Sequence, residues 1–333
     1  MVPSHPIIAV LGTGSIGQRH LAVLRDELGM QPVAVPLRES RLEELRAQGY
    51  AAASTIAQAV APGDLCIIST DTGRHLQDAL AALQSGCHLL VEKPILPTAF
   101  GLNELEQTAE RCDRRIFVGC VLRFDAGLQR FRDSLPLIGP VHSVRIECQS
   151  FLPDWRPGRD YRLSYSARRT EGGVLRDLIH EIDYALWLYG HPDRVFCQLG
   201  NTGQLGIEAE ESADLFWISS MQVAVSMRLD YLARFPRRRM RAFATQGELE
   251  WDAHSMCVTL DLVGQPIQEW NCPMERNQMF REQISAFLRA VQGGDRGALA
   301  TFDEGAFAIA LCDAARQSAQ SGKSERIKDW RTV

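Results

Sequence analysis

Short apolar runs alternate with amphipathic stretches along the first third of the chain, up to about residue 119. The apolar runs are IIAVLG, PVAV, DLCIIS, HLLVE and IFVG, and each has the length of a buried strand. Between them, apolar residues recur at three- and four-residue spacing around residues 16–28, 40–48, 73–84 and 99–111. Strands alternating with helices in this way predict a doubly wound parallel sheet covered by helices.

The pattern changes after about residue 123. A strand over 141–150 leads into a polar loop and then a strong amphipathic helix over 172–190. The segments that follow predict a run of mainly antiparallel strands. We place these strands at 194–199, 212–219, 222–229, 238–244, 247–251 and 256–262, and two closing helices at 276–291 and 302–318. The basic cluster PRRRMR around Arg237 is typical of a solvated edge strand, where positive charge discourages further pairing.

The chain has 333 residues, more than one hydrophobic core usually fills. The change of pattern therefore predicts two domains, 1–122 and 123–333. The fold class we expect is α/β, with an N-terminal Rossmann domain and a C-terminal α+β domain that contains a large, mainly antiparallel open sheet. We expect the second domain to bind substrate and to join subunits.

Composition narrows the function classes. A net charge of −5 gives no electrostatic footprint for nucleic acid or an anionic membrane, and no apolar run is long enough to span a bilayer. The nine cysteines are scattered without a CxxC pair, which fits a reducing compartment and not a zinc site. The start, MVPSHPIIAVLG, lacks the features of a signal peptide. We expect a cytoplasmic protein with no metal and no nucleic-acid or membrane partner.

A GxGxxG motif follows the first predicted strand and opens the first predicted helix. In such a turn the first glycine permits the tight bend, the second admits a pyrophosphate, and the third lets helix and strand pack closely. The N–H groups of the first helical turn then face the phosphate oxygens. The motif predicts a dinucleotide site that contains Gly12, Thr13, Gly14, Ser15, Ile16 and Gly17.

The end of the second strand bears on the choice of cofactor. An acidic residue usually stands there and binds the adenosine ribose of NAD, but here PVAV runs into Pro36 and Leu37. Arg38, with Ser40 and Arg41 near it, predicts instead a contact with the 2′-phosphate of NADP(H). Glu39 leaves NAD open, because it can serve as a displaced ribose-binding acid.

The segment STDTGRHLQDALAALQSGCHLLVEKP resembles the Gfo/Idh/MocA oxidoreductase family, in which a strand ends in the tripeptide EKP. The resemblance implies that Lys93 reaches both the nicotinamide and the substrate hydroxyl, and that the peptide bond before the proline is cis. A lysine at the carboxyl end of a parallel strand stands where open α/β sheets bind ligands. The same segment supplies further cofactor candidates, of which the last is equally compatible with a structural cap: Glu92, Ser69, Thr70 and His75.

The segment GGVLRDLIHEIDYALWLYG is similar to the family's helix that carries a catalytic Asp and His. Asp177, His180 and Tyr184 recur at i, i+3 and i+7, on a different face from the apolar stripe. The resemblance implies that His180 is the general acid/base, that Asp177 orients it or holds a sugar hydroxyl, and that Tyr184 lines the pocket. Without the resemblance, a polar stripe that merely faces solvent is the favoured interpretation. The DxxH spacing departs from the commoner DxxxH and resembles members from surface-polysaccharide gene sets.

Two further regions bear on the substrate. The family's RF element is matched by Arg123 and Phe124, and Arg123 is compatible with lining the cleft or with a structural salt bridge. The loop over 152–173 interleaves arginines with aromatic residues, which suits an anionic, ring-containing ligand or, alternatively, an arm at a subunit interface. Its substrate-binding candidates are Trp155, Tyr161, Tyr165 and Arg168.

Together these features predict an NAD(P)-dependent oxidoreductase that moves hydride between nicotinamide and a CH–OH group. The expected substrate is a sugar, cyclitol or nucleotide-linked sugar, in keeping with a role in surface-polysaccharide metabolism. We expect a homodimer or homotetramer formed through the C-terminal sheet. Two other interpretations remain, a dinucleotide-sensing binding protein without catalysis and an NAD-dependent glycosidase.

Overall fold

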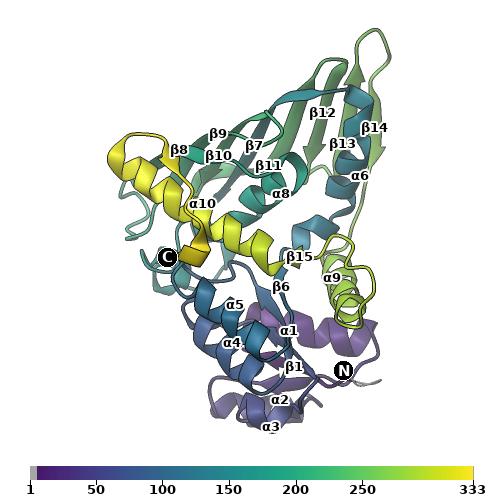
Figure 1. Cartoon of the computed structure of the whole chain (residues 1–333), viewed down its shortest axis with the longest axis vertical. Helices are drawn as coiled ribbons and strands as arrows, with labels where there is room; N and C mark the ends of the chain where they lie inside the picture. Colours follow the sequence, from purple (N-terminus) through teal and green to yellow (C-terminus); the bar gives the residue numbers. More distant parts are fainter. Residues whose placement is uncertain (1–5, 333) are drawn as a thin grey trace. The chain divides into compact units, whose positions relative to one another are not determined.

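The computed structural model describes residues 6–332, which divide into two compact units. The first unit runs up to Phe124 and also contains Glu275–Ala306 and the end of the chain from Trp330. The second unit consists of Asp125–Met274 and Phe307–Asp329. Each unit contains one large sheet (Figure 1).

The first unit is built on a seven-stranded sheet with the order β15-β6-β5-β4-β1-β2-β3. Its strands are β1 (Ile8–Leu11), β2 (Val33–Val35), β3 (Ala51–Ala52), β4 (Leu65–Ile68), β5 (His88–Glu92), β6 (Ile116–Gly119) and β15 (Ala300–Thr301). Strands β1 to β6 pair in parallel, and β15 adds an antiparallel edge. The order 3-2-1-4-5-6 of the parallel strands is that of a Rossmann fold, so the predicted doubly wound sheet is confirmed.

The helices of this unit are α1 (Ser15–Ala22), which continues as a π-helical turn over Val23–Glu27, α2 (Ser40–Ala47), α3 (Ile56–Ala59), α4 (His75–Gln84), α5 (Leu102–Arg111) and α9 (Arg276–Val291). A boundary after residue 122 assigns α9 and β15 to the second domain, but the structure groups them with the first unit. Three contacts explain the difference. β15 pairs with β6, the Phe287 ring packs edge-on against Phe117 with centroids 5.9 Å apart, and Arg115 donates to the Ala290 carbonyl at 2.7 Å.

The second unit is built on a nine-stranded sheet with the order β14-β13-β12-β11-β7-β10-β9-β8-β16. Its strands are β7 (Val141–Phe151), β8 (Arg194–Gly200), β9 (Ser212–Ile218), β10 (Ala224–Asp230), β11 (Leu232–Ala244), β12 (Gly247–Asp252), β13 (Cys257–Leu262), β14 (Gln268–Asn271) and β16 (Glu325–Arg326). The pairings are antiparallel except for β7 with β10, which confirms the mainly antiparallel sheet.

Helices α6 (Ala126–Ser134) and α8 (Ile179–Tyr189) pack against this sheet (Figure 1). The single helix predicted over 172–190 is in fact two helices, because one residue separates α7 (Val174–Asp177) from α8. Leu178 lies between them with φ −97° and ψ 32°. The last long helix, α10 (Phe302–Ser321), begins in the first unit and continues into the second.

The prediction that the PRRRMR cluster forms an edge strand is wrong. β11 lies in the middle of the sheet, between β12 and β7. Acidic residues of β12 neutralise its outward-facing arginines: Arg239 pairs with Asp252 at 2.9 Å and Arg241 pairs with Glu248. Arg238 pairs instead with Glu181 of α8, so three of the four arginines in the cluster have an acidic partner. These ion pairs are compatible with a basic strand at the centre of the sheet.

Candidate functional site

The GxGxxG turn lies between β1 and α1, and its three glycines meet different surroundings. Gly12 has φ +89°, and a Cβ there would lie 2.7 Å from the backbone of Ser69. A Cβ on Gly17 would lie 1.9 Å from the Gly12 carbonyl oxygen. A Cβ on Gly14, by contrast, would meet nothing within 4 Å. The first and third glycines therefore serve packing, and the space above the second is open to a ligand.

The start of α1 is suited to a phosphate group. Gly14 is the N-cap, and no side chain from the described part of the chain caps the helix. The N–H groups of the first turn, from Ser15 onward, are thus left for a ligand. Ser69, at the end of β4, donates its hydroxyl to the Gly12 carbonyl at 2.8 Å and fixes the turn against the neighbouring strand.

Arg38 follows β2 and is exposed. Because β2 runs parallel to β1, Arg38 lies at the same carboxyl end of the sheet as the glycine turn. Within residues 6–332 its guanidinium has no hydrogen-bond or ion-pair partner. Arg41, by contrast, pairs with Glu44 one helical turn further on. Arg38 is therefore the available cation at the position where a Rossmann domain binds the adenosine ribose.

His75, at the start of α4, is only 1% exposed. Its Nδ1 lies 2.9 Å from the Pro94 carbonyl oxygen and its Nε2 lies 3.0 Å from the Thr70 carbonyl oxygen. Burial lowers the pKa of His75, so the neutral ring is favoured. The imidazole therefore joins the loop after β4 to the loop after β5. This is a structural role, which is the alternative that the sequence left open for His75. Thr70 itself donates its hydroxyl to Asp78 at 2.8 Å.

The EKP tripeptide stands at the carboxyl end of β5, where Lys93 is half-buried and the Lys93–Pro94 peptide bond is cis. The Glu92 carboxylate lies 2.8 Å from Nε2 of His20, which is fully buried on α1. Its other oxygen accepts the Lys93 backbone N–H at 3.2 Å. The sequence interpretation missed His20, and its signal is its place three residues beyond Gly17, the last glycine of the motif.

Asp177 and His180 lie in the second unit, on either side of the break between α7 and α8. Asp177 is 5% exposed and His180 is 9% exposed, so the solvent-facing alternative is wrong. The Tyr231 hydroxyl donates to Asp177 Oδ2 at 2.7 Å. Tyr165 also lies beside this carboxylate, and the Asp177 charge together with burial raises the pKa of the Tyr165 phenol. Tyr231 was not among the predicted site residues.

Tyr184 lies in the core and not at a pocket wall. It is fully buried, and its ring packs edge-on against Trp251 with centroids 5.6 Å apart. Burial raises its pKa well above the usual value. Next to it, Glu181 is fully buried and pairs with Arg238 of β11 at 2.8 Å. This part of α8 therefore anchors the helix to the sheet.

Arg123 belongs to the first unit, where it is 1% exposed and donates to Glu304 at 3.0 Å. Arg123 therefore forms the structural salt bridge and does not line a cleft.

The loop over 152–173 brings two of its four candidates, Trp155 and Tyr165, to Tyr231 and Asp177, whereas Tyr161 and Arg168 have other partners. Trp155 packs edge-on against Tyr231 with centroids 5.3 Å apart, and Tyr161 donates to the Leu205 carbonyl at 2.9 Å. Arg168 is exposed and pairs with Glu171 at 3.1 Å. Tyr165 is thus the loop residue that lies beside Asp177.

The fold defines a protein with a Rossmann domain of the dinucleotide-binding type. Residues 7–120 match the family model described as "Oxidoreductase family, NAD-binding Rossmann fold", and residues 137–250 match "GFO/IDH/MocA C-terminal domain". The chain belongs to the GFO/IDH/MocA oxidoreductase family.

Two curated relatives indicate the kind of chemistry found in similar proteins. The chain is 29% identical to the inositol 2-dehydrogenase/D-chiro-inositol 3-dehydrogenase of Shouchella clausii over 54% of this chain, and it spans about half, 52%, of that relative's length. It is 22% identical to the myo-inositol 2-dehydrogenase of Thermotoga maritima over 97% of this chain and 98% of that one.

Solved structures show the same fold. An oxidoreductase domain protein from Kribbella flavida superposes with a TM-score of 0.85 at 17% identity, over 99% of this chain and 100% of that one. Levoglucosan dehydrogenase in complex with NADH and levoglucosan superposes with a TM-score of 0.83 at 16% identity, over 97% and 100%. Within the part of the chain that is described, no helix is long and apolar enough to cross a membrane.

Proposed function

We propose that this chain is a dehydrogenase or reductase that moves hydride between a nicotinamide cofactor and a secondary alcohol or ketone of a sugar, cyclitol or nucleotide-linked sugar. The observation that carries the proposal lies in the first unit. The open space above Gly14 and the half-buried Lys93 stand at the carboxyl ends of β1 and β5, which run parallel in one sheet. Ligands of open α/β sheets bind at this edge.

The residues present fit a bound dinucleotide and divide the remaining work. The cofactor supplies the hydride chemistry when bound. Lys93 donates a hydrogen bond to the reacting oxygen and stabilises its developing negative charge. His180 takes the hydroxyl proton in the oxidation direction and returns it in the reduction direction. Asp177 orients the imidazole or holds a neighbouring hydroxyl of the substrate.

The substrate class rests on two supports. The curated relatives are named for inositols, and levoglucosan dehydrogenase is named for a sugar derivative. Exposed arginines in the loop over 152–173, such as Arg156 and Arg168, favour an anionic sugar or nucleotide-linked sugar. The DxxH spacing favours a role in surface-polysaccharide metabolism.

A turnover assay tests this function. Purified protein is incubated with NAD or NADP and a panel of polyols, sugars and nucleotide-linked sugars, and nicotinamide absorbance is followed. We expect turnover with one class, and a loss of about 100-fold or more in His180→Gln. His142→Gln, an exposed histidine on β7, is the control that keeps full activity. Dinucleotide binding without turnover across the panel favours the sensing protein, and free sugar without a change in absorbance identifies the glycosidase.

We also propose that the cofactor is NADP(H), held at its 2′-phosphate by Arg38. Arg38→Ala then raises KM for NADPH by about 10-fold or more while KM for NADH stays unchanged, since one charge-assisted contact is lost. Arg46→Ala is the matched control, because this exposed arginine of α2 already pairs with Glu43. If Arg38→Ala leaves the KM for NADPH and the KM for NADH at their wild-type values, the proposal is contradicted. NAD is then favoured, with Glu39 on the ribose.

The assembly we propose is a homodimer or homotetramer joined by the nine-stranded sheet. Phe196 and Phe216 stand opposite each other on β8 and β9 and are 41% and 47% exposed, and Ile218 on the same face of β9 is 45% exposed. Apolar side chains gathered on one sheet face indicate a surface that another subunit covers.

The nine cysteines are all free thiols, which supports a cytoplasmic setting.

A further inference from the structure

We infer that Tyr231 is a positioning residue for the proposed reaction, and that a polar network in the second unit holds its hydroxyl on the Asp177 carboxylate. The inference rests on the proposed function and adds residues that it does not name. Tyr231 is fully buried, and its hydroxyl donates to Asp177 Oδ2 at 2.7 Å from a position 54 residues further along the chain. A buried donor on a carboxylate fixes the direction in which that carboxylate points.

The backbone of Tyr231 is held from both sides. Tyr231 stands between the end of β10 and the start of β11. Its N–H donates to the Glu211 carbonyl at 2.8 Å, and its carbonyl accepts the Leu152 N–H at 3.0 Å. Its ring meets the edge of Trp155. The phenol therefore has little freedom to leave Asp177.

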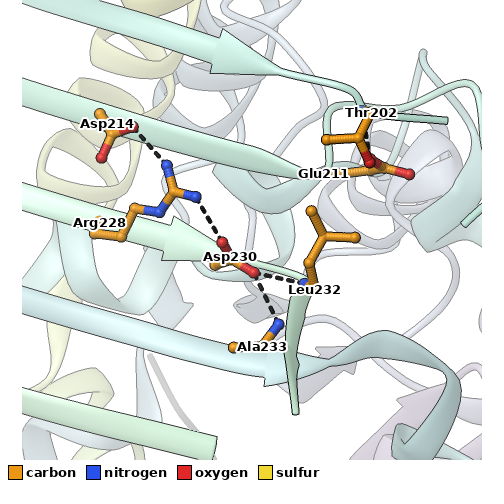
Figure 2. A network of polar contacts seen from close by, with 7 residues as sticks. All are labelled: Thr202, Glu211, Asp214, Arg228, Asp230, Leu232 and Ala233. Carbon is orange, nitrogen blue, oxygen red and sulfur yellow. Dashed lines mark hydrogen bonds and ion pairs between the residues drawn. The ribbon is translucent and has the colours of Figure 1, made fainter. Parts of the chain in front are cut away.

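Asp230, the neighbouring residue, fixes the turn that follows Tyr231. Its Oδ1 accepts the N–H groups of Leu232 at 2.5 Å and Ala233 at 2.9 Å (Figure 2). Its Oδ2 accepts from Arg228 at 2.6 Å, and the same guanidinium binds Asp214 at 2.5 Å (Figure 2). Asp230 is only 7% exposed, so its carboxylate is largely shielded from water.

Glu211 holds the other side. Its side chain is fully buried and accepts from the Thr202 N–H at 2.6 Å and the Thr202 hydroxyl at 2.7 Å (Figure 2). Its second oxygen accepts the Leu205 N–H at 2.9 Å. The carbonyl that receives the Tyr231 N–H therefore belongs to a residue whose own side chain is fully engaged. Two buried carboxylates, Asp230 and Glu211, thus brace one tyrosine.

The phenol is suited to this task over the whole working range of pH. Burial, together with the Asp177 charge, raises the pKa of Tyr231 well above its usual value, so the hydroxyl keeps its proton and stays a donor. Tyr165 adds a second phenol beside the same carboxylate. Tyr231 is thus the tyrosine whose hydroxyl is bonded to Asp177, and Tyr165 lies near the same charge.

A double-mutant cycle tests the inference. Tyr231→Phe removes the hydroxyl and keeps the ring, and we expect kcat/KM for the substrate to fall about 10- to 100-fold, mainly in kcat, with KM for the cofactor unchanged. In an Asp177→Asn background the same change has little further effect, because the partner of the hydroxyl is already altered. Tyr189→Phe is the matched control: this buried tyrosine of α8 has its hydroxyl 3.8 Å from the Met240 sulfur and keeps full activity.

Other outcomes are equally decisive. A Tyr231→Phe effect that is undiminished in the Asp177→Asn background overturns the inference and leaves the proposed function standing. A wild-type protein without turnover on the whole panel overturns the proposed function, and the inference with it. If Tyr231→Phe does not fold, Arg228→Met replaces it in the same cycle, where it releases Asp230 and gives a smaller loss that also depends on Asp177.

Discussion

The three glycines of the phosphate turn show how one residue type meets three different demands. Gly12 needs its positive φ, and Gly17 needs its missing Cβ because the Gly12 carbonyl occupies that place. Gly14 needs neither for folding, since the space beside it is open. Gly14 is therefore a glycine that ligand binding requires and the fold does not.

This difference separates binding from stability. Gly14→Ala should unfold at the wild-type temperature but bind dinucleotide about 10-fold more weakly or worse, since its methyl group stands where the pyrophosphate approaches. Gly17→Ala should lower the free energy of unfolding by about 1–3 kcal/mol, because its Cβ meets backbone that cannot move cheaply. Thermal unfolding and a fluorescence titration with the cofactor measure both quantities. Equal stability losses in the two variants would contradict this account.

His88 on β5 makes stability depend on pH. It is 7% exposed, and its Nδ1 accepts the Arg115 N–H at 3.1 Å. Burial, followed by the nearby charges of Arg114 and Arg115, lowers the pKa of His88 to about 4. The unfolded chain binds a proton near the ordinary value of about 6.5, whereas the folded chain does not until about pH 4. Stability from this residue is therefore complete above pH 6.5 and is lost as the pH falls toward 4.

Substitution should remove this pH dependence. Between about pH 6.5 and 4, the free energy of unfolding of the wild type should fall by about 1.4 kcal/mol per pH unit more than that of His88→Asn. Urea unfolding at several pH values measures the difference between the two proteins, and His142→Asn, an exposed histidine, is the control. Parallel stability curves for His88→Asn and wild type would show that His88 titrates normally in the folded chain.

At the level of elements, one buried ion pair joins α8 to the centre of the nine-stranded sheet. Glu181 is fully buried, and Arg238 of β11 reaches it at 2.8 Å while a second guanidinium nitrogen lies 3.4 Å from the Cys148 sulfur. Burial raises the pKa of the Cys148 thiol to about 12, so it stays neutral beside this pair. His180 directly precedes Glu181, and the ion pair therefore also anchors the start of the helix that carries the proposed acid/base.

Breaking the pair on one side should be costly. Arg238→Met leaves the Glu181 charge buried without its counter-ion and should lower the free energy of unfolding by about 3–5 kcal/mol. The double change Arg238→Met with Glu181→Met should recover most of the loss, because no charge remains buried. Arg237→Met, at the exposed neighbouring position, should stay within about 0.5 kcal/mol of wild type. Urea denaturation of the four proteins decides whether the recovery occurs.

At the scale of the whole molecule, the two sheets differ in what covers them. The strands of the seven-stranded sheet are buried throughout β1, β4 and β6, as expected for a parallel sheet between helices. The nine-stranded sheet alternates instead: in β9, Leu215 and Trp217 are buried, whereas Phe216 and Ile218 are exposed. An exposed apolar row on a large sheet suits association between subunits.

Disrupting that row should change the oligomeric state. Phe216→Asp places a charge in the middle of the row and should convert the proposed dimer or tetramer to a smaller species at micromolar concentration. Val263→Asp, at an 83% exposed site in the turn between β13 and β14, should leave the assembly unchanged. Sedimentation equilibrium measures both. A wild-type protein that is monomeric throughout this concentration range would rule out the proposed interface.

The amino-acid sequence by itself determined the features that local spacing encodes. The glycine turn, five of the six parallel strands of the first unit and the helix over 276–291 were all predicted, and the structure contains them. Helical and strand periodicity, and the backbone freedom of glycine, act over a few residues, so each can be detected without knowing what packs nearby. The elements β3 and α3 were missed because β3 has only two residues and α3 is a single helical turn, which is too short to show a 3.6-residue period.

Only the tertiary structure decided which distant residues meet. It placed the basic strand β11 at the centre of its sheet, brought α9 and β15 to the first unit, and set His20 on Glu92 and Tyr231 on Asp177, across 72 and 54 residues of chain. These outcomes depend on which apolar faces of helices and sheets are buried against each other. That burial then decides which charged and polar side chains meet. Sequence spacing carries no information on such distances, because the intervening chain can follow many paths between the same two residues.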